Sequence, residues 1–112
     1  IERAAERGVL MASLLADLAE RHPCVGAVRS LGLFGVVELV RDRTTMEPMA
    51  PFNGSSPEMK ALARYFRAEG LYTFVRWNTF FTNPPLCITE AEMREAFAII
   101  DKGLEITDRA AA

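Results

Sequence analysis

Hydrophobic residues recur at intervals of three and four along the first part of the chain, with charged residues between them. The apolar positions of residues 2–21 are Met11, Leu14, Leu15 and Leu18. This spacing puts them on one stripe of a helix. His22-Pro23 should end the helix, because proline cannot continue the hydrogen-bond ladder and restricts the residue before it. The pattern therefore predicts an amphipathic helix over residues 2–21.

Two short runs rich in valine, leucine and phenylalanine follow. They are Val25–Leu31 and Leu33–Val40, and Gly32 separates them. Their length and composition are typical of strands, and the glycine between them favours an antiparallel pair. Glu38 interrupts the second run, and we expect it to be a solvated or hydrogen-bonded structural carboxylate.

The segment 41–56 is predicted to be a long connection. Its turn-forming residues are Pro48, Pro51, Asn53, Gly54, Ser55 and Ser56. Unstructured loops of this length are uncommon and are often functional or interfacial. Met46, Met49 and Phe52 lie in the segment, and they either fold back on their own domain or contact another surface. The sequence leaves both alternatives open.

Two further helices carry terminal signals. The first should run over residues 57–69, with Ser56 as its cap and Gly70 as its left-handed stop. The second follows Thr89, which forms a capping box with Glu92. Their apolar stripes are Met59, Leu62 and Phe66 in the first, and Met93, Phe97, Ile100 and Leu104 in the second.

A hairpin is predicted between these two helices. Leu71–Trp77 should be a strand, Asn78-Thr79 its turn, and Phe80–Thr82 the returning strand. Arg76 lies inside the apolar first half of this hairpin. A charged side chain in a hydrophobic strand costs free energy unless a partner or solvent meets it. Arg76 therefore faces either a ligand or the solvent.

The predicted element order is α-β-β-α-β-β-α. With 112 residues, the chain is long enough for one domain with a single core. The economical arrangement is an α+β fold, in which a small, mostly antiparallel sheet of about four strands is covered on one face by three helices. The chain begins with Ile1 and enters directly into a helical pattern, so we expect it to be a piece of a longer protein.

Composition excludes several partners. The formal net charge of −2 gives no electrostatic reason to expect nucleic acid or an anionic membrane surface as a partner. The apolar runs are shorter than the roughly 20 residues of a membrane span. The first residues also lack the apolar core of a signal peptide, which favours a cytoplasmic location.

Residues that often carry chemistry are sparse. Cys24, Cys87 and His22 do not have zinc-site spacing, and we expect two buried free thiols in a reducing compartment. His22 is expected to be a surface or capping residue, and Lys60 and Lys102 to be solvated. Phosphate-binding glycine loops and the nucleophile motif G-x-S-x-G are missing from the sequence. The residues alone predict an α+β domain with one unexplained arginine.

Two blocks resemble a known family. Residues Val28–Leu39 read VRSLGLFGVVEL, similar to the pattern V-R-G-x-G-L-x-x-G-x-E-L, and Pro84–Glu92 read PPLCITEAE, similar to P-P-L-x-I-T-x-x-E. Both patterns are typical of the C-terminal small domain of class III (omega-type) aminotransferases. The resemblance covers nearly the whole chain, with Ser30 in place of the usual glycine.

The resemblance implies a longer enzyme that depends on pyridoxal 5′-phosphate (PLP). A large domain outside this chain would supply the lysine that binds PLP, so the chain alone would be inactive. The reaction would transfer an amino group from an amine or amino acid to an oxo acid, in a homodimer. The alternative, from a different class of protein, is an independent α+β binding or interaction module without a catalytic role.

One functional residue is implied by the resemblance. Arg76 matches a family arginine, in the strand before P-P-L, that binds the substrate carboxylate, and a guanidinium suits bidentate binding of that group. The connection from Arg76 to Pro84 is shorter than in the family, and a structural or solvent-facing Arg76 is the alternative. Arg29 also matches a family arginine, with an expected structural role in binding nearby carbonyls. Trp77 and Phe74 are expected in the core, with the wall of a pocket as the alternative.

Overall fold

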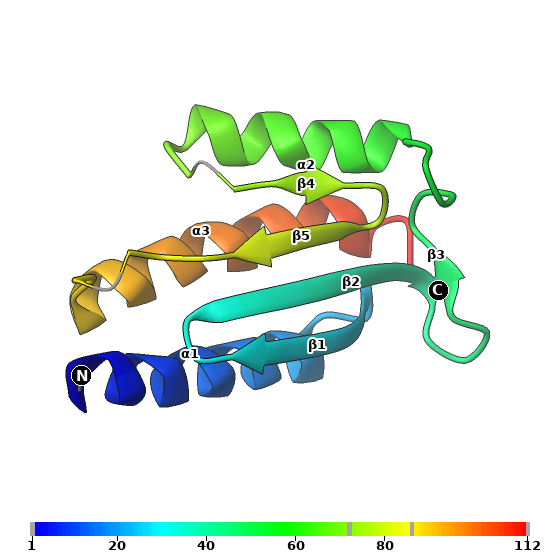
Figure 1. Ribbon diagram of the computed structural model, residues 1–112. Helices are drawn as coiled ribbons and strands as arrows, with labels where there is room; N and C mark the ends of the chain where they lie inside the picture. Colours follow the sequence, from blue (N-terminus) through cyan, green and yellow to red (C-terminus); the bar gives the residue numbers. More distant parts are fainter. Residues whose placement is uncertain (1, 72, 86, 112) are drawn as a thin grey trace.

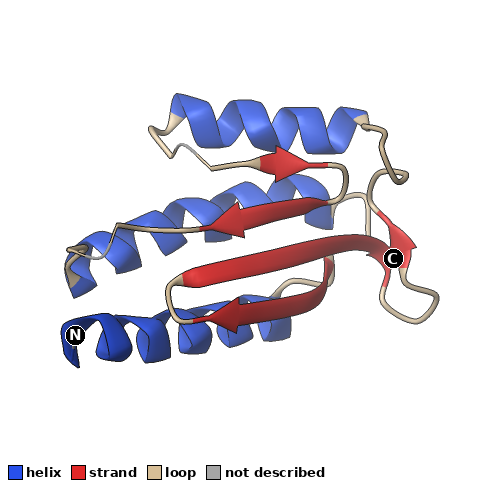
Figure 2. Ribbon diagram, viewed as in Figure 1, coloured by secondary structure: helices blue, strands red, loops and turns tan. Residues whose placement is uncertain are grey.

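The fold is one antiparallel sheet with three helices packed against a single face (Figures 1 and 2). The computed structural model describes residues 2–71, 73–85 and 87–111. The elements are α1 (Glu2–Arg21), β1 (Val25–Leu31), β2 (Phe34–Asp42), β3 (Glu47–Pro48), α2 (Pro57–Ala68), β4 (Val75–Arg76), β5 (Thr79–Thr82) and α3 (Glu90–Asp108). This arrangement confirms the predicted α+β class, with five strands instead of about four.

Strand β2 is the centre of the sheet. The strand order is β1-β2-β5-β4, and β3 pairs with the end of β2. Val37 lies opposite Val28 on one side and Phe80 on the other, so these three side chains share the face that meets the helices. Gly32 makes the β1–β2 turn with a φ of 59°, a conformation that glycine adopts without steric cost.

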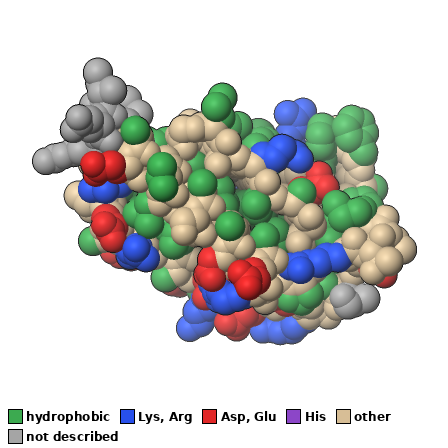
Figure 3. All heavy atoms as spheres, turned by 90° about the horizontal axis from the view of Figure 1, so that it is seen from below, with side chains coloured by type: hydrophobic (Ala, Val, Ile, Leu, Met, Phe, Trp, Pro, Cys, Tyr) green, Lys and Arg blue, Asp and Glu red, His purple; other side chains and the backbone are tan. Residues whose placement is uncertain are grey.

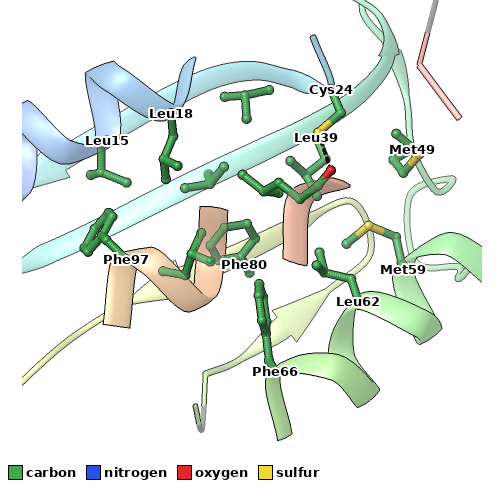
Figure 4. Packing of buried hydrophobic residues seen from close by; sticks show 14 of the residues in the cluster. Leu15, Leu18, Cys24, Leu39, Met49, Met59, Leu62, Phe66, Phe80 and Phe97 are labelled. Carbon is green, nitrogen blue, oxygen red and sulfur yellow. Dashed lines mark hydrogen bonds between the residues drawn. The ribbon is translucent and has the colours of Figure 1, made fainter. Parts of the chain in front are cut away.

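The core lies between this face and the helix layer (Figure 4). In Figure 1, α1 lies behind β1, and α3 lies behind β5. Phe80 meets Phe66 of α2 edge-on, with ring centroids 5.3 Å apart and an interplanar angle of 68°. The buried stripes of α2 and α3 are the predicted ones, which confirms both helix assignments.

Gly35 explains how α1 can approach the sheet so closely. A Cβ atom on Gly35 would lie 2.3 Å from Thr82 Oγ1 and 3.0 Å from Leu15 Cδ1. Thr82 in turn donates a hydrogen bond to Met11 Sδ at 3.5 Å. A larger residue at this position would push α1 away from β2, so the glycine is required for packing.

The ends of α2 and α3 follow the predicted signals. Ser56 Oγ accepts a hydrogen bond from Met59 N at 3.3 Å, and Gly70 has a φ of 83°. At α3, Thr89 and Glu92 form both hydrogen bonds of the capping box. These local signals confirm the predicted caps of both helices.

The connection 41–56 is more ordered than predicted. Strand β2 runs on to Asp42, and β3 folds back on it, with Pro48 opposite Val40. Met49 is fully buried, whereas Met46 is 42% and Phe52 is 80% exposed. The prediction of one long loop was therefore wrong, because a backbone turn closes a small hairpin that periodicity over so few residues cannot reveal.

The second hairpin also differs from its prediction. Strand β4 contains only Val75 and Arg76, instead of residues 71–77, and Tyr72 lies outside the described residues. The turn is Trp77-Asn78, one residue earlier than expected, because Thr79 already pairs with Arg76 in the ladder. Trp77 adopts a φ of 53°, which is rare for a bulky residue.

His22 was predicted to be a surface or capping residue, and this prediction was wrong, because the side chain is buried and contacts α3. Its side chain is buried, with Nε2 2.6 Å from Asp101 Oδ1 and Nδ1 2.5 Å from Asp108 Oδ2. Each ring nitrogen therefore faces a carboxylate oxygen of α3. These two contacts clamp the end of α1 to α3.

The two cysteines lie in opposite environments, so the expectation of two buried thiols holds only for Cys24. Burial, reinforced by the hydrogen bond to Asp108, raises the pKa of Cys24 to about 12. Cys87 is exposed on the connection before α3. Only thiolates react as nucleophiles, so the two thiols should differ in reactivity.

A native thiol titration at pH 8 should therefore detect one rapidly reacting cysteine per chain. Unfolding the chain in denaturant should reveal the second, because Cys24 then regains access to solvent and an ordinary pKa. Cys87→Ser should abolish the fast phase, and Cys24→Ser should leave it intact. Two fast equivalents in the native protein would contradict the burial of Cys24.

None of the helices in the described ranges combines the length and the apolar character that a membrane crossing requires.

Candidate functional site

The hairpin of β4 and β5 holds Arg76 next to a tight turn. Asn78 ties the turn to the centre of the sheet: its Nδ2 donates to Leu39 O at 2.9 Å, and its carbonyl accepts from Leu39 N at 2.8 Å. Thr79 Oγ1 donates to Arg76 O at 2.8 Å. The hairpin tip is therefore fixed to β2, even though β4 itself is short.

Arg76 points away from the helix layer. Val75 packs against the core, and strand alternation turns Arg76 to the opposite, open face of the sheet. Its guanidinium carbon lies 4.4 Å from the centroid of the Trp77 ring. Among the ion pairs and side-chain hydrogen bonds that join described residues, none involves this guanidinium. Arg76 thus presents its charge and its donors to the open face.

A carboxylate on the same face lies too far away to neutralise Arg76. The register aligns Arg76 with Thr79, and Thr79 with Glu38. Arg76 and Glu38 are therefore two strand spacings apart, or about 10 Å. Glu38 is half-buried, and no hydrogen bond of its side chain joins it to a described residue. The structure therefore favours the solvated alternative for Glu38 and leaves the arginine available to an external anion.

Arg29 belongs to the same open face and lies opposite Val36 in β2. Its side chain is exposed. The expected hydrogen bonds from Arg29 to nearby carbonyls are not made to any carbonyl that the structure describes, so that prediction was wrong. Arg29 instead adds a second positive charge to the open face.

An aromatic stack continues the face beyond Arg76. Phe81 lies between Phe34 and Phe74, with ring centroids 5.8 Å and 5.7 Å apart. Phe74 is 61% exposed, so its expected place in the core was wrong. These rings, with Thr73 and Asn83, line a shallow depression of about 540 Å³. The open face therefore combines an apolar hollow with an adjacent guanidinium.

Exposed apolar side chains extend to the edge of the molecule. Seen from the side of α1 and β1, hydrophobic side chains reach the surface between clusters of charged ones (Figure 3). Val9 of α1 and Leu31 of β1 are the large apolar residues exposed on these elements.

Other candidate groups lie elsewhere or are missing. Lys60 on α2 and Lys102 on α3 are exposed on the helix layer, as predicted. Within the described ranges no three His, Cys, Asp or Glu side chains come together in a possible metal site. Arg76 is thus the predicted site residue whose position suits ligand binding.

Comparison with known proteins found relatives by sequence and by structure, but not among family models. No family model matches the chain. The chain is 31% identical over 118 residues to a taurine–pyruvate aminotransferase of Bilophila wadsworthia, covering 97% of this chain and 24% of that protein. It is 30% identical over 111 residues to an ethanolamine-phosphate phospho-lyase homolog of Caenorhabditis elegans, covering 97% of this chain and 23% of that protein.

The structural match extends over almost the whole chain. A taurine:2-oxoglutarate aminotransferase from Bifidobacterium kashiwanohense, solved in complex with PLP and glutamate, superimposes with a TM-score of 0.90. The match covers 99% of this chain and 25% of that one, at 29% identity. This chain matches the C-terminal domain of class III, omega-type aminotransferases. It spans about a quarter of the length of these relatives.

The two sequence blocks that resemble this family flank the open face. The first, Val28–Leu39, forms most of the β1–β2 hairpin, including the packing glycine Gly35. The second, Pro84–Glu92, leads from β5 into the capped start of α3, and its Leu86 lies outside the described residues. The motif residues therefore position α1 and α3 against the sheet that carries Arg76.

The two lysines of the chain, Lys60 and Lys102, both lie on the helix layer, across the sheet from Arg76. In PLP enzymes the lysine that binds the cofactor lies close to the substrate. Neither of these lysines shares a face of the sheet with Arg76.

The sequence reasoning missed the surroundings of Trp77. This side chain is half-buried instead of belonging to the core. It packs on Phe52, with ring centroids 4.4 Å apart, and its Nε1 donates to Asn53 Oδ1 at 3.3 Å. A signal was available, because Phe52 stands between a proline and Asn53-Gly54, where a large apolar residue needs a partner.

Proposed function

We propose that this chain is the C-terminal domain, residues 1–112, of a PLP-dependent aminotransferase. The enzyme would move an amino group from an amine or amino acid to an oxo acid. The observation that carries the proposal is an exposed Arg76 that forms no ion pair with a described residue, on the open face of a domain whose fold agrees with a PLP-containing aminotransferase at a TM-score of 0.90.

The contribution of this chain is recognition of the substrate carboxylate. The guanidinium of Arg76 would donate two parallel N–H bonds to the carboxylate of an amino acid or oxo acid. A charge-assisted bond of this kind contributes about 1.5–3 kcal/mol. The aromatic hollow beside Arg76 would form part of the pocket wall.

The chemical step belongs to the rest of the enzyme in this proposal. PLP, held by a large domain outside this chain, supplies the electron sink for the reaction. The chain by itself would be inactive, and the complete enzyme would be a cytoplasmic homodimer. The comparisons favour this proposal over an independent binding module.

A phosphate-bearing amine is a second candidate substrate, because one relative is named as an ethanolamine-phosphate phospho-lyase homolog. A guanidinium also binds phosphate through paired N–H donors. Arg76 would then hold the phosphate, and removal of the amine and phosphate would replace amino transfer.

Replacing Arg76 with alanine in the complete enzyme should lower kcat/KM for amino acids and oxo acids by about 10- to 100-fold. Plain amines, which lack the carboxylate, should be affected less than about threefold. Steady-state kinetics with a matched pair of substrates, one an amino acid and one its decarboxylated amine, measures the difference.

Arg29→Ala is the matched control, because it removes a second exposed arginine from the same face. It should leave both substrates nearly unchanged. Equal losses for the amino acid and the amine in Arg76→Ala would exclude carboxylate recognition. A selective loss with O-phosphoethanolamine instead would favour the phosphate alternative.

A further inference from the structure

The ring of Trp77 lies between Arg76 and the segment that follows β3. We define the tip cluster as Phe52, Asn53, Arg76 and Trp77. The guanidinium carbon of Arg76 is 4.4 Å from the centroid of the Trp77 ring, and the Phe52 ring is also 4.4 Å from it, tilted by 45°. Two segments that are far apart in sequence thus meet on one indole.

The backbone is shaped to present this indole. Trp77 and Asn53 both have φ near +60°, at 53° and 59°. An L-residue as large as tryptophan rarely adopts this conformation, and it persists only where surrounding contacts hold it. Asn53 Oδ1 accepts the indole N–H, and Asn78 anchors the turn to Leu39. Asn78 therefore holds the turn, and Asn53 orients the indole ring that the turn carries.

We propose that Trp77, supported by Phe52 and Asn53, is a positioning residue for Arg76. The inference rests on the proposed function of Arg76 and adds how its side chain is prepared for the anion. A long arginine side chain loses rotamer freedom when it binds, and a site that already restricts it binds more tightly. A cation over an aromatic ring gains electrostatic attraction even at an exposed site.

The tip cluster leaves the binding edge of Arg76 available. A cation–π contact does not use hydrogen-bond donors, whereas a carboxylate partner would occupy them. The guanidinium lies over the Trp77 ring, and Glu38 lies two strands away. Trp77 therefore restrains Arg76 without competing for the anion.

The kinetic test uses the complete enzyme. Trp77→Leu should raise KM for amino acid or oxo acid substrates about two- to fivefold, with kcat unchanged, because it removes only the restraint. Trp77→Phe keeps an aromatic face and should recover most of the difference. Phe52→Leu should shift KM in the same direction by a smaller factor. Leu31→Ala is the control, since it changes an exposed apolar side chain that belongs neither to the tip cluster nor to the aromatic hollow.

A second measurement reports on the contact without activity. The Nε–H resonance of Arg76 in the arginine-labelled complete enzyme, assigned by its loss in Arg76→Lys, should carry an upfield ring-current shift. Trp77→Leu should remove this shift. Asn53→Gly should reduce it, because glycine accepts the positive φ but cannot accept the indole N–H.

The outcomes separate this inference from the proposed function. If Arg76→Ala impairs carboxylate substrates but Trp77→Leu leaves KM and the Arg76 resonance unchanged, positioning is overturned and carboxylate recognition stands. If Trp77→Leu raises KM equally for amines, the residue is only structural and the inference is overturned. If Arg76→Ala has no selective effect, the proposed function itself fails.

Discussion

Phe80→Ala should lower the free energy of unfolding by about 3–5 kcal/mol, as expected for deleting a fully buried phenyl ring. Phe80 is 0% exposed and lies under the helix layer, edge-on to Phe66 of α2 and beside Val37 of β2. Deleting the ring would leave a cavity between α2 and the sheet, because these elements meet through this side chain. Equilibrium unfolding in denaturant, followed by far-UV circular dichroism, measures the loss.

Phe81→Ala is the matched control, because it removes the same ring from the next residue of β5. Phe81 points to the open face and stacks with Phe34 and Phe74. Losing these partly exposed contacts should cost about 0.5–1.5 kcal/mol. Equal losses for the two variants would contradict the assigned orientation of β5.

His22→Leu should destabilise the domain by about 2–4 kcal/mol, because two carboxylates would lose the buried hydrogen-bonding partner that they share. The side chains of Asp101 and Asp108 are 37% and 21% exposed, so water would replace part of the lost hydrogen bonding. The same denaturant titration measures the change. Lys102→Ala on the exposed side of α3 should change stability by less than about 0.5 kcal/mol. A similar loss in both variants would exclude the clamp.

The clamp also predicts the direction of acid unfolding. Burial acts to raise the pKa of Asp101, but the hydrogen bonds from His22 and Arg21 outweigh it and hold that pKa below its ordinary value of 3.8. A carboxyl group with a lowered pKa stabilises the fold above its unfolded pKa, and this contribution is lost as pH falls through the folded pKa. Between pH 5 and 3 the wild type should therefore lose more stability than His22→Leu. A steeper loss in the variant would contradict this assignment.

Sequence reasoning succeeded where structure depends on near neighbours. The stripe of α1, the cap at Ser56 and the capping box at Thr89 are relations between residues three or four positions apart. Such periodicity and capping are set within a turn or two of the chain. It failed at β3, where pairing with β2 decides the backbone, and at the Trp77-Asn78 turn, where pairing of β4 with β5 does so.

On the open face, too, local features were predictable and long-range contacts were not. The P-P-L-C-I-T-E-A-E block indicated an arginine in the preceding strand, and strand alternation allowed Arg76 to lie on an open face. The partners of Trp77 could not be predicted, because Phe52 and Asn53 are 24 or more residues away from it in the sequence. Contacts of this range depend on how β3, α2 and the sheet pack together.

Patterns along the chain were enough to predict the three helices, two antiparallel hairpins and Arg76 as the candidate site residue. The packed structure was needed to show that Phe80 faces the core and Phe81 the open face, since a shift of one residue exchanges the faces of a strand. It also decided that His22 joins two aspartates 79 and 86 residues away. Local patterns fix which elements form, whereas buried charges and exposed rings find their partners only when those elements pack.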